Sequence, residues 1–193
     1  SRGQYPAYAL KEMERKGTMP VMEEGDKSIL KKAKMDFIAV NYYRTNCAEA
    51  LKANDEHPFG SREGTVDFNM YGLFKMSMNP NLKATEYGAA IDPSGLRVAL
   101  NEYWQRYHLP LIITENGLGT PDILTEDGKV HDEYRIDYLR SHIEACALAI
   151  EDGVEMIGYC PWSFIDLVST HQGYEKHYGF VYVNREEKDL KDN

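Results

Sequence analysis

The sequence predicts an α/β fold organised around a parallel sheet. Apolar runs of strand length alternate along the chain with helical periodicities, and no low-complexity linker or internal repeat interrupts this alternation. The run at 111–113 is apolar without polar alternation, which is typical of a strand buried on both faces of a parallel sheet. At 193 residues, the chain is expected to form one domain or one piece of a domain.

The first half of the chain contains three expected elements. Residues 36–41 form a predicted buried strand, which ends in the polar and aromatic cluster Asn41-Tyr42-Tyr43-Arg44. Residues 54–80 are rich in Gly, Asn, Asp and Met and exceed the usual length of a connection, which predicts a loop that covers a site. A helix is expected to begin at Asp92-Pro93, and its sheet-facing residues are Leu96, Leu100, Tyr103 and Tyr107.

The second half continues the alternation. After the strand that ends at Glu115, Asp132 can cap a second helix, which stops near Gly153. A third strand is predicted at 156–162, where Pro161 comes late enough to spare the hydrogen-bond ladder. Residues 179–184 predict a short β segment, and mobility is expected in 54–80 and after Asn184. The apolar stripe expected on the second helix is Ile136, Leu139, Ile143, Cys146 and Ile150.

Composition narrows the class of partner. The net charge of -9 argues against nucleic-acid binding and against attachment to anionic membranes, because both require a basic surface. No apolar run approaches the roughly 20 residues needed to span a bilayer, and the N-terminus lacks the layout of a signal peptide, so we expect a cytoplasmic protein with a small-molecule partner. Cys47, Cys146 and Cys160 lack CxxC spacing and predict neither a disulfide framework nor a metal site. Cys146 is expected to pack as a small apolar residue.

Polar and aromatic side chains follow each of the predicted strands. Because the carboxyl ends of parallel strands lie at one edge of a sheet, we expect Asn41, Tyr43, Glu115 and Trp162 to face a common site. An aromatic plane suits the apolar face of a sugar ring, and a phenol can hold a carboxylate ionised and oriented. Two simpler interpretations stay open at this point: Glu115 can end an ordinary βα unit, and strand-end Trp and Tyr often only pack.

The wording Ile113-Thr114-Glu115-Asn116-Gly117 resembles the nucleophile motif of glycoside hydrolase family one, the retaining β-glycosidases built on a (β/α)8 barrel. Residues 36–43, 113–117 and 158–163 resemble the sixth, seventh and eighth barrel strands, and residues 91–97 and 137–142 resemble connecting helices. The resemblance therefore implies a partial (β/α)8 TIM barrel, with residues 1–193 as the C-terminal part of a single barrel domain.

The same resemblance implies roles for the strand-end residues. Glu115 would be the nucleophile, Tyr43 its hydrogen-bond partner, Trp162 the platform under the sugar and Asn41 a wall of the substrate site. The implied mechanism is double displacement without a metal or organic cofactor.

Residues 163–180 carry a second similarity. Family members that act on unphosphorylated sugars usually have a Glu-Trp pair where this chain has Ser169-Thr170. Loss of that carboxylate, with a lysine and a tyrosine nearby, is what an anionic 6-phosphate requires. Ser169, Lys176 and Tyr178 resemble the phosphate-binding triplet of the 6-phospho-β-glycosidase branch, and Thr170 favours glucosides over galactosides. Without this match, the three residues would be ordinary members of a polar loop.

Two departures from the family pattern limit the implied activity. The sequence contains no Asn-Glu-Pro motif, which carries the family's acid/base glutamate, although retaining hydrolysis needs two carboxyl groups about 5 Å apart. We therefore expect this chain to be an inactive fragment of a 6-phospho-β-glucosidase that self-associates through exposed partial-barrel edges. Ala89 stands where the family usually has a Trp beside the leaving group, which would open that subsite.

Three other functions are kept as alternatives. A 6-phospho-β-galactosidase differs from the favoured 6-phospho-β-glucosidase only in the sugar epimer that it accepts. A neutral β-glucosidase would act on sugars without the phosphate group. The third alternative belongs to another class, a non-catalytic module that binds sugar phosphates.

Overall fold

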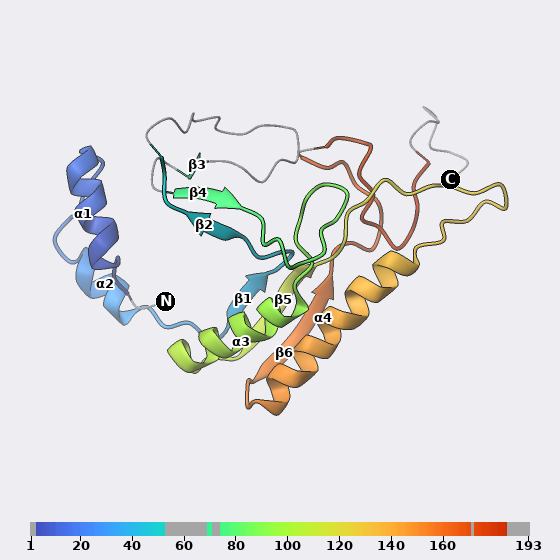
Figure 1. Cartoon of the computed structure of the whole chain (residues 1–193). Coiled ribbons are helices and arrows are strands. Elements are labelled where there is room, and N and C mark those ends of the chain that lie inside the picture. The colour runs from blue at the N-terminus through green and yellow to red at the C-terminus, as the bar shows by residue number, and fades with distance from the viewer. Residues whose placement is uncertain (1–2, 53–68, 71–73, 171, 185–193) are drawn as a thin grey trace.

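The computed structural model describes residues 3–52, 69–70, 74–170 and 172–184 (Figure 1). Its centre is a parallel sheet of β1 (Ile38–Asn41), β5 (Leu111–Asn116) and β6 (Met156–Pro161), in the order β1-β5-β6. Among the described residues this sheet is partial and does not close into a barrel. The three strands expected from the apolar runs are therefore confirmed, but the burial predicted for the first is wrong. Ile38 and Val40 are only half-buried and Phe37 is 49% exposed, because β1 is an edge strand of the described sheet.

The register of the sheet brings the strand ends together. Ile38 lies opposite Leu111, and Asn41 lies opposite Glu115 after a shift between Val40 and Asn41. The backbone N–H of Tyr42 continues the ladder by donating to the Glu115 carbonyl at 2.9 Å. The carboxyl ends of β1 and β5 consequently form one edge.

Two helices pack together beside the sheet, α3 (Pro93–Tyr107) and α4 (Glu133–Glu151) (Figure 1). Asp92 caps α3 as its carboxylate accepts from Gly95 N at 2.8 Å, which stabilises the first turn. The core joins both helices to the sheet through Tyr42, Leu96, Leu100, Leu111, Ile113, Cys146, Ala149 and Val154. The face predicted for α3 is confirmed at Leu96 and Leu100, and Tyr103 packs against the core, whereas Tyr107 is half-buried and outside it. The apolar packing predicted for Cys146 is confirmed.

The apolar stripe predicted for α4 is wrong for three of its members. Ile136, Ile143 and Ile150 are 49%, 50% and 53% exposed. The helix instead buries a different face, made of Arg135, Tyr138, His142, Ala145, Cys146 and Ala149. Small side chains on that face permit close approach to α3 and the sheet, while the isoleucines lie seven residues apart on a face that no described element covers.

A second, antiparallel sheet was not predicted. It contains β2 (Cys47–Glu49), β3 (Asn69–Met70) and β4 (Phe74–Ser77) in the order β2-β4-β3. The prediction of a loop that covers a site over 54–80 is therefore wrong at 69–70 and 74–77, which form strands. Strands this short carry little periodicity, because two to four residues cannot establish an alternation. Residues 53–68 and 71–73, with the mobility expected there, lie outside the described residues.

The short β segment expected at 179–184 does not form a strand in the described chain. Only an isolated parallel bridge joins Val181 to Ile165. The Asp166 carboxylate accepts from the backbone N–H groups of Gly179 and Val183, so a side chain supplies bonds that a neighbouring strand would otherwise make. The tail after Asn184 lies outside the described residues.

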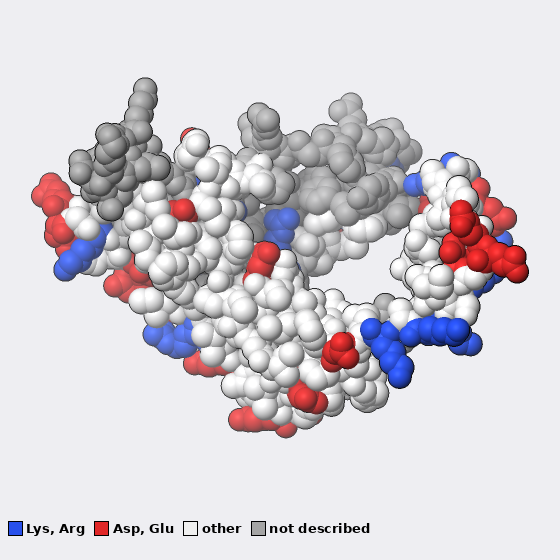
Figure 2. Space-filling view, turned by 180° about the vertical axis from the view of Figure 1, so that it is seen from behind, with Lys and Arg blue, Asp and Glu red and all other residues white. Residues whose placement is uncertain are grey.

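The N-terminal pair α1 (Ala7–Lys16) and α2 (Asp26–Lys32) lies apart from the sheet (Figure 1). Neither helix contains a buried residue. Figure 2 shows open space between this pair and the rest of the molecule. Across the described part of the chain, no helix combines the length and apolarity required to cross a membrane.

Candidate active site

Glu115 and Tyr43 form a hydrogen-bonded pair at the carboxyl edge of the parallel sheet. Tyr43 Oη donates to Glu115 Oε2 at 2.6 Å. Burial, and then this hydrogen bond, raises the pKa of Tyr43 above its usual value. The phenol therefore stays protonated and acts as a donor, which fixes one carboxylate oxygen and leaves the other available for chemistry.

A buried polar network lies behind this pair. Asn116, which is fully buried, donates through Nδ2 to the Tyr42 carbonyl at 2.7 Å and to Tyr138 Oη at 3.2 Å. Its Oδ1 accepts from the Tyr159 hydroxyl. Tyr138 Oη in turn donates to the Tyr43 carbonyl at 2.9 Å. Three elements, β5, β6 and α4, thus hold the backbone that carries the Tyr43–Glu115 pair.

Sequence reasoning missed the members of this network. Asn116 had a usable signal, because successive side chains of a strand point to opposite faces of the sheet. A polar residue directly after Glu115 therefore lies on the opposite face and needs hydrogen-bond partners there. Tyr138 had a weaker one, since it lies within a helix segment named for its resemblance and outside the predicted stripe. Buried side-chain amides and phenols require hydrogen-bond partners. Asn116 bonds with both Tyr138 and Tyr159 and so helps to satisfy both hydroxyls.

Asn41 and Trp162 flank the pair on the neighbouring strand ends. Asn41 is exposed, and its Oδ1 accepts from Thr114 Oγ1 at 2.6 Å. Trp162 is partly buried, and its backbone N–H donates to the Asn116 carbonyl at 2.8 Å. A Cβ added to Gly117 would overlap the Trp162 carbonyl oxygen. The glycine after Glu115-Asn116 is therefore required for the close approach of the two strand ends.

The loop after β6 brings Ser169, Lys176 and Tyr178 together. Tyr178 Oη donates to Ser169 Oγ at 3.1 Å, and the Lys176 ammonium lies 5.2 Å from the centre of the Tyr178 ring. Burial, and then the positive charge of Arg44, lowers the pKa of Lys176. Ser169 is buried whereas Thr170, the fourth residue predicted for this loop, is exposed. Thr170 is therefore next to Ser169 in the chain but is not packed among the three residues.

Asp166 organises this loop, although the sequence analysis assigned it no role. Its side chain is fully buried and contacts His177 Nδ1 at 2.7 Å. It also accepts from the backbone N–H groups of Tyr178 at 3.0 Å and Gly179 at 2.7 Å. Burial would raise the pKa of this carboxyl, but the hydrogen bonds from His177 and the backbone outweigh burial and lower it. Asp166 is thereby kept ionised and holds the segment between Lys176 and Gly179.

The segment that follows Glu115 connects the two groups. The backbones of Thr120 and His177 exchange hydrogen bonds of 3.0 and 2.9 Å. A Cβ on Gly119 would overlap the side chain of Lys176 and come within 2.6 Å of Tyr178 Cε1. The Tyr43–Glu115 pair and the loop of Ser169 therefore share one edge of the molecule, joined through residues 117–120.

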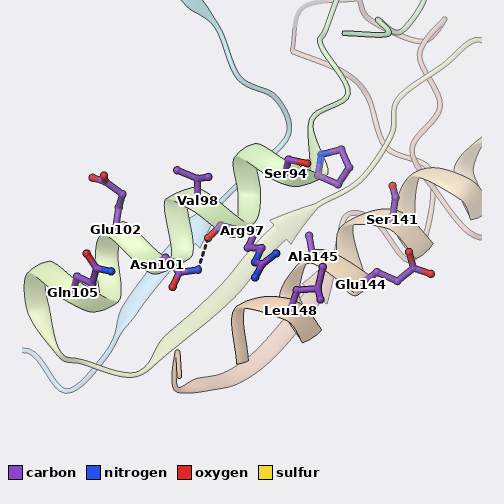
Figure 3. A pocket seen from close by; sticks show the side chains of 11 residues that line it. Ser94, Arg97, Val98, Asn101, Glu102, Gln105, Ser141, Glu144, Ala145 and Leu148 are labelled. Carbon is purple, nitrogen blue, oxygen red and sulfur yellow. Dashed lines mark hydrogen bonds between the residues drawn. The ribbon is translucent and has the colours of Figure 1, made fainter. Parts of the chain in front are cut away.

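A separate groove of about 590 Å³ lies between α3 and α4 (Figure 3). Pro93, Arg97, Asn101, Glu144 and Leu148 are among its lining residues, and none of the predicted site residues lines it. It is therefore distinct from the strand-end site.

Comparisons with known proteins agree with this arrangement. The family described as Glycosyl hydrolase family 1 matches residues 1–192. The chain is 46% identical over 195 residues to the aryl-phospho-beta-D-glucosidase BglC of Bacillus subtilis (strain 168), covering 98% of this chain and 41% of that protein. It is 40% identical over 189 residues to the 6-phospho-beta-glucosidase AscB of Escherichia coli (strain K12), covering 97% and 37%. The chain thus spans about two fifths of the length of these relatives.

The fold comparison gives the same result. A beta-glucosidase from Thermotoga maritima in complex with deoxynojirimycin superimposes with a TM-score of 0.77 and 30% identity, over 99% of this chain and 39% of that one. The prediction of a partial (β/α)8 barrel is confirmed. From the match over 192 residues and from these relatives, the chain belongs to glycosyl hydrolase family 1.

Proposed function

We propose that this chain carries the nucleophile and the phosphate-binding group of a retaining 6-phospho-β-glucosidase. The observation that carries the proposal is the grouping of Ser169, Lys176 and Tyr178 on the same edge as Glu115. A hydroxyl pair and an ammonium group offer donors and positive charge to an anionic phosphate. Relatives named as aryl-phospho- and 6-phospho-beta-glucosidases support the substrate class.

Glu115 is proposed to act on the anomeric carbon. One carboxylate oxygen attacks that carbon, the bond to the leaving oxygen breaks, and a covalent glycosyl ester forms. Tyr43 holds the second oxygen at 2.6 Å and so orients the attack. Water then cleaves the ester and releases the sugar with retained configuration. Trp162 is proposed as the platform under the sugar ring, and Asn41 as a polar contact at its rim.

The leaving oxygen needs a proton from a second carboxyl group. The resemblance assigns this role to a glutamate in an Asn-Glu-Pro motif, which this sequence lacks. The chain also spans only 41% of BglC. We therefore infer that the chain alone does not turn over substrate efficiently, and that it works as the C-terminal part of a single barrel domain.

Two neighbouring activities differ from the proposal by single features. A beta-glucosidase is among the similar structures, but for an activity on neutral sugars Ser169 supplies no carboxylate to the sugar hydroxyls. A 6-phospho-beta-galactosidase of Clostridium acetobutylicum is 35% identical to the chain, and Thr170 is the residue that favours the glucose epimer. One such residue changes epimer preference by a modest energy of about 1–3 kcal/mol.

The isolated chain is also proposed to self-associate. β1 and β6 are edge strands of the described sheet, and unpaired edges together with the exposed isoleucines of α4 favour association. Sedimentation velocity would show dimers or larger species; a monomer at all concentrations would contradict this.

Because phosphorylated sugars carry charges that do not cross bilayers unaided, we propose the cytoplasm as the compartment.

Hydrolysis of p-nitrophenyl β-glucoside 6-phosphate tests the enzymatic proposal. The chain alone is compared with the same chain extended upstream by the matching segment of BglC. Activity only in the extended protein, with a preference for the phosphorylated over the neutral glucoside, is the expected result. Activity in the chain alone would show that another of its carboxylates serves as the acid. Phosphate binding without turnover in both forms would favour a non-catalytic binding module.

A further inference from the structure

Lys176 lies over two aromatic rings, only one of which belongs to its own loop. Its ammonium nitrogen is 4.8 Å from the centre of the Tyr87 ring and 5.2 Å from that of Tyr178. Both distances are within the range of a cation–π contact, which is about 6 Å. Tyr87 comes from the segment between β4 and α3, far from Lys176 in the sequence. It is not among the phosphate-binding residues proposed above.

Tyr87 is held by a closed turn. Thr85 N donates to the Ala89 carbonyl at 2.8 Å, and Gly88 N donates to the Thr85 carbonyl at 2.9 Å. The Thr85 hydroxyl also accepts from Ala89 N at 3.1 Å, and Gly88 adopts a φ of 72°, a conformation that suits glycine. These bonds fix the backbone on both sides of Tyr87 before the helix cap at Asp92.

A third contact confines the lysine stem. Its Cε lies too close to the position that a Cβ on Gly119 would take, so only a glycine leaves room for the stem there. The Tyr87 hydroxyl donates to the Glu175 carbonyl at 3.4 Å, a long bond that contributes less than the ring. Burial, with the nearby Arg44 charge, lowers the pKa of Lys176, and contact with two electron-rich ring faces compensates the cation for lost water.

We propose that Tyr87 is a positioning residue that holds the Lys176 ammonium for the sugar phosphate and so favours phosphorylated over neutral sugars. The inference rests on the phosphate site proposed above. Lysine is a point charge on a flexible stem, and contact with two rings removes many alternative positions before the ligand arrives. A neutral sugar does not use this charge, so its binding is independent of Tyr87.

Two substitutions separate the ring from its hydroxyl. Tyr87→Phe keeps the aromatic face, whereas Tyr87→Leu removes it at similar bulk. NMR of the Lys176 side chain detects the ring directly, because a methylene over an aromatic face is shifted upfield. Calorimetric titration with glucose 6-phosphate, and separately with glucose, measures selectivity. Lys176→Ala is the reference for loss of the charge, and thermal melts establish that each variant is folded.

The expected pattern is specific. Tyr87→Phe keeps the upfield shift and binds glucose 6-phosphate within about twofold of the unmodified chain. Tyr87→Leu loses the part of the shift that Tyr87 contributes, while Tyr178 keeps the rest, and weakens binding about tenfold, the scale of one partly desolvated cation–π contact. Glucose binding is the same in all three. An unchanged Lys176 signal in Tyr87→Leu would overturn the inference whether or not ligand binds.

The other outcomes separate this inference from the function on which it rests. Weak binding by Lys176→Ala with full affinity in Tyr87→Leu overturns the role of Tyr87 alone. Full affinity in Lys176→Ala, or no binding by the unmodified chain, counts against the phosphate site and this inference together. Equal losses for glucose and glucose 6-phosphate in Tyr87→Leu would show a general structural role and contradict positioning.

Discussion

Replacing Tyr138 with phenylalanine removes one hydroxyl from the network behind the Tyr43–Glu115 pair. That hydroxyl donates to the Tyr43 carbonyl at 2.9 Å and accepts from Asn116 Nδ2 at 3.2 Å. Tyr138 is 3% exposed, so water cannot easily replace either bond. Each buried hydrogen bond contributes about 1 kcal/mol net, and the expected loss in unfolding free energy is therefore about 2 kcal/mol.

Urea unfolding measures this loss. With a slope of about 2 kcal/mol per molar, the midpoint should fall by roughly 1 M. Tyr134→Phe is a matched control one turn earlier on α4. Its hydroxyl donates to Asp122 at 2.6 Å, but Tyr134 is 40% exposed, so solvent compensates and the loss should stay below about 1 kcal/mol. Equal losses in the two variants would refute the reasoning that burial makes the Tyr138 network costly to break.

Three further predictions concern the site itself. Tyr43→Phe in the upstream-extended protein should lower kcat by about tenfold or more, because Glu115 loses the orienting bond of 2.6 Å; steady-state kinetics would contradict this if only KM changed. Gly117→Ala should destabilise the chain by about 3 kcal/mol or more in urea melts, because its Cβ overlaps the Trp162 carbonyl, and an unchanged midpoint would refute the overlap. Asp166 has a lowered pKa, so its stabilising effect is complete above the ordinary carboxyl pKa of 3.8 and is lost as the pH falls through the lower folded value. Urea midpoints of the unmodified chain and of Asp166→Asn should therefore converge only in that acidic range, and a constant difference down to the acid limit would argue against an ionised Asp166.

The parallel sheet could be predicted because its strands are continuous apolar runs. Leu111 and Ile113 are fully buried, and a run that is apolar on both faces has few alternatives to a covered parallel strand. The strand-end residues Asn41, Tyr43 and Glu115 then follow from topology, since parallel strands end at one edge. These positions therefore depend only on local composition and on the parallel topology.

The buried face of α4 could not be predicted from the same rules. Apolarity selects Ile143 and Ile150, yet the helix buries Arg135 and His142. Arg135 is tolerated because it pairs with Asp122 at 2.8 Å, and such a partner is visible only once a loop has folded back. A helix face is decided by what covers it, and periodicity does not contain that information.

The phosphate-binding loop could likewise be predicted only in part. Ser169, Lys176 and Tyr178 were identified through resemblance, whereas Asp166 and Tyr87 act through contacts that cross the chain. The Asp166 carboxylate replaces a strand partner, and Tyr87 reaches Lys176 from another segment. Neither contact leaves a spacing in the sequence, because the residues meet only in three dimensions.

Covalent trapping tests the central claim most directly. A 2-deoxy-2-fluoro-β-glucosyl reagent, with and without a 6-phosphate, is incubated with the upstream-extended protein, and the labelled peptide is identified by mass spectrometry. We expect one adduct on Glu115, formed with the phosphorylated reagent in strong preference to the neutral one. An adduct on another residue, or equal labelling by both reagents, would contradict it.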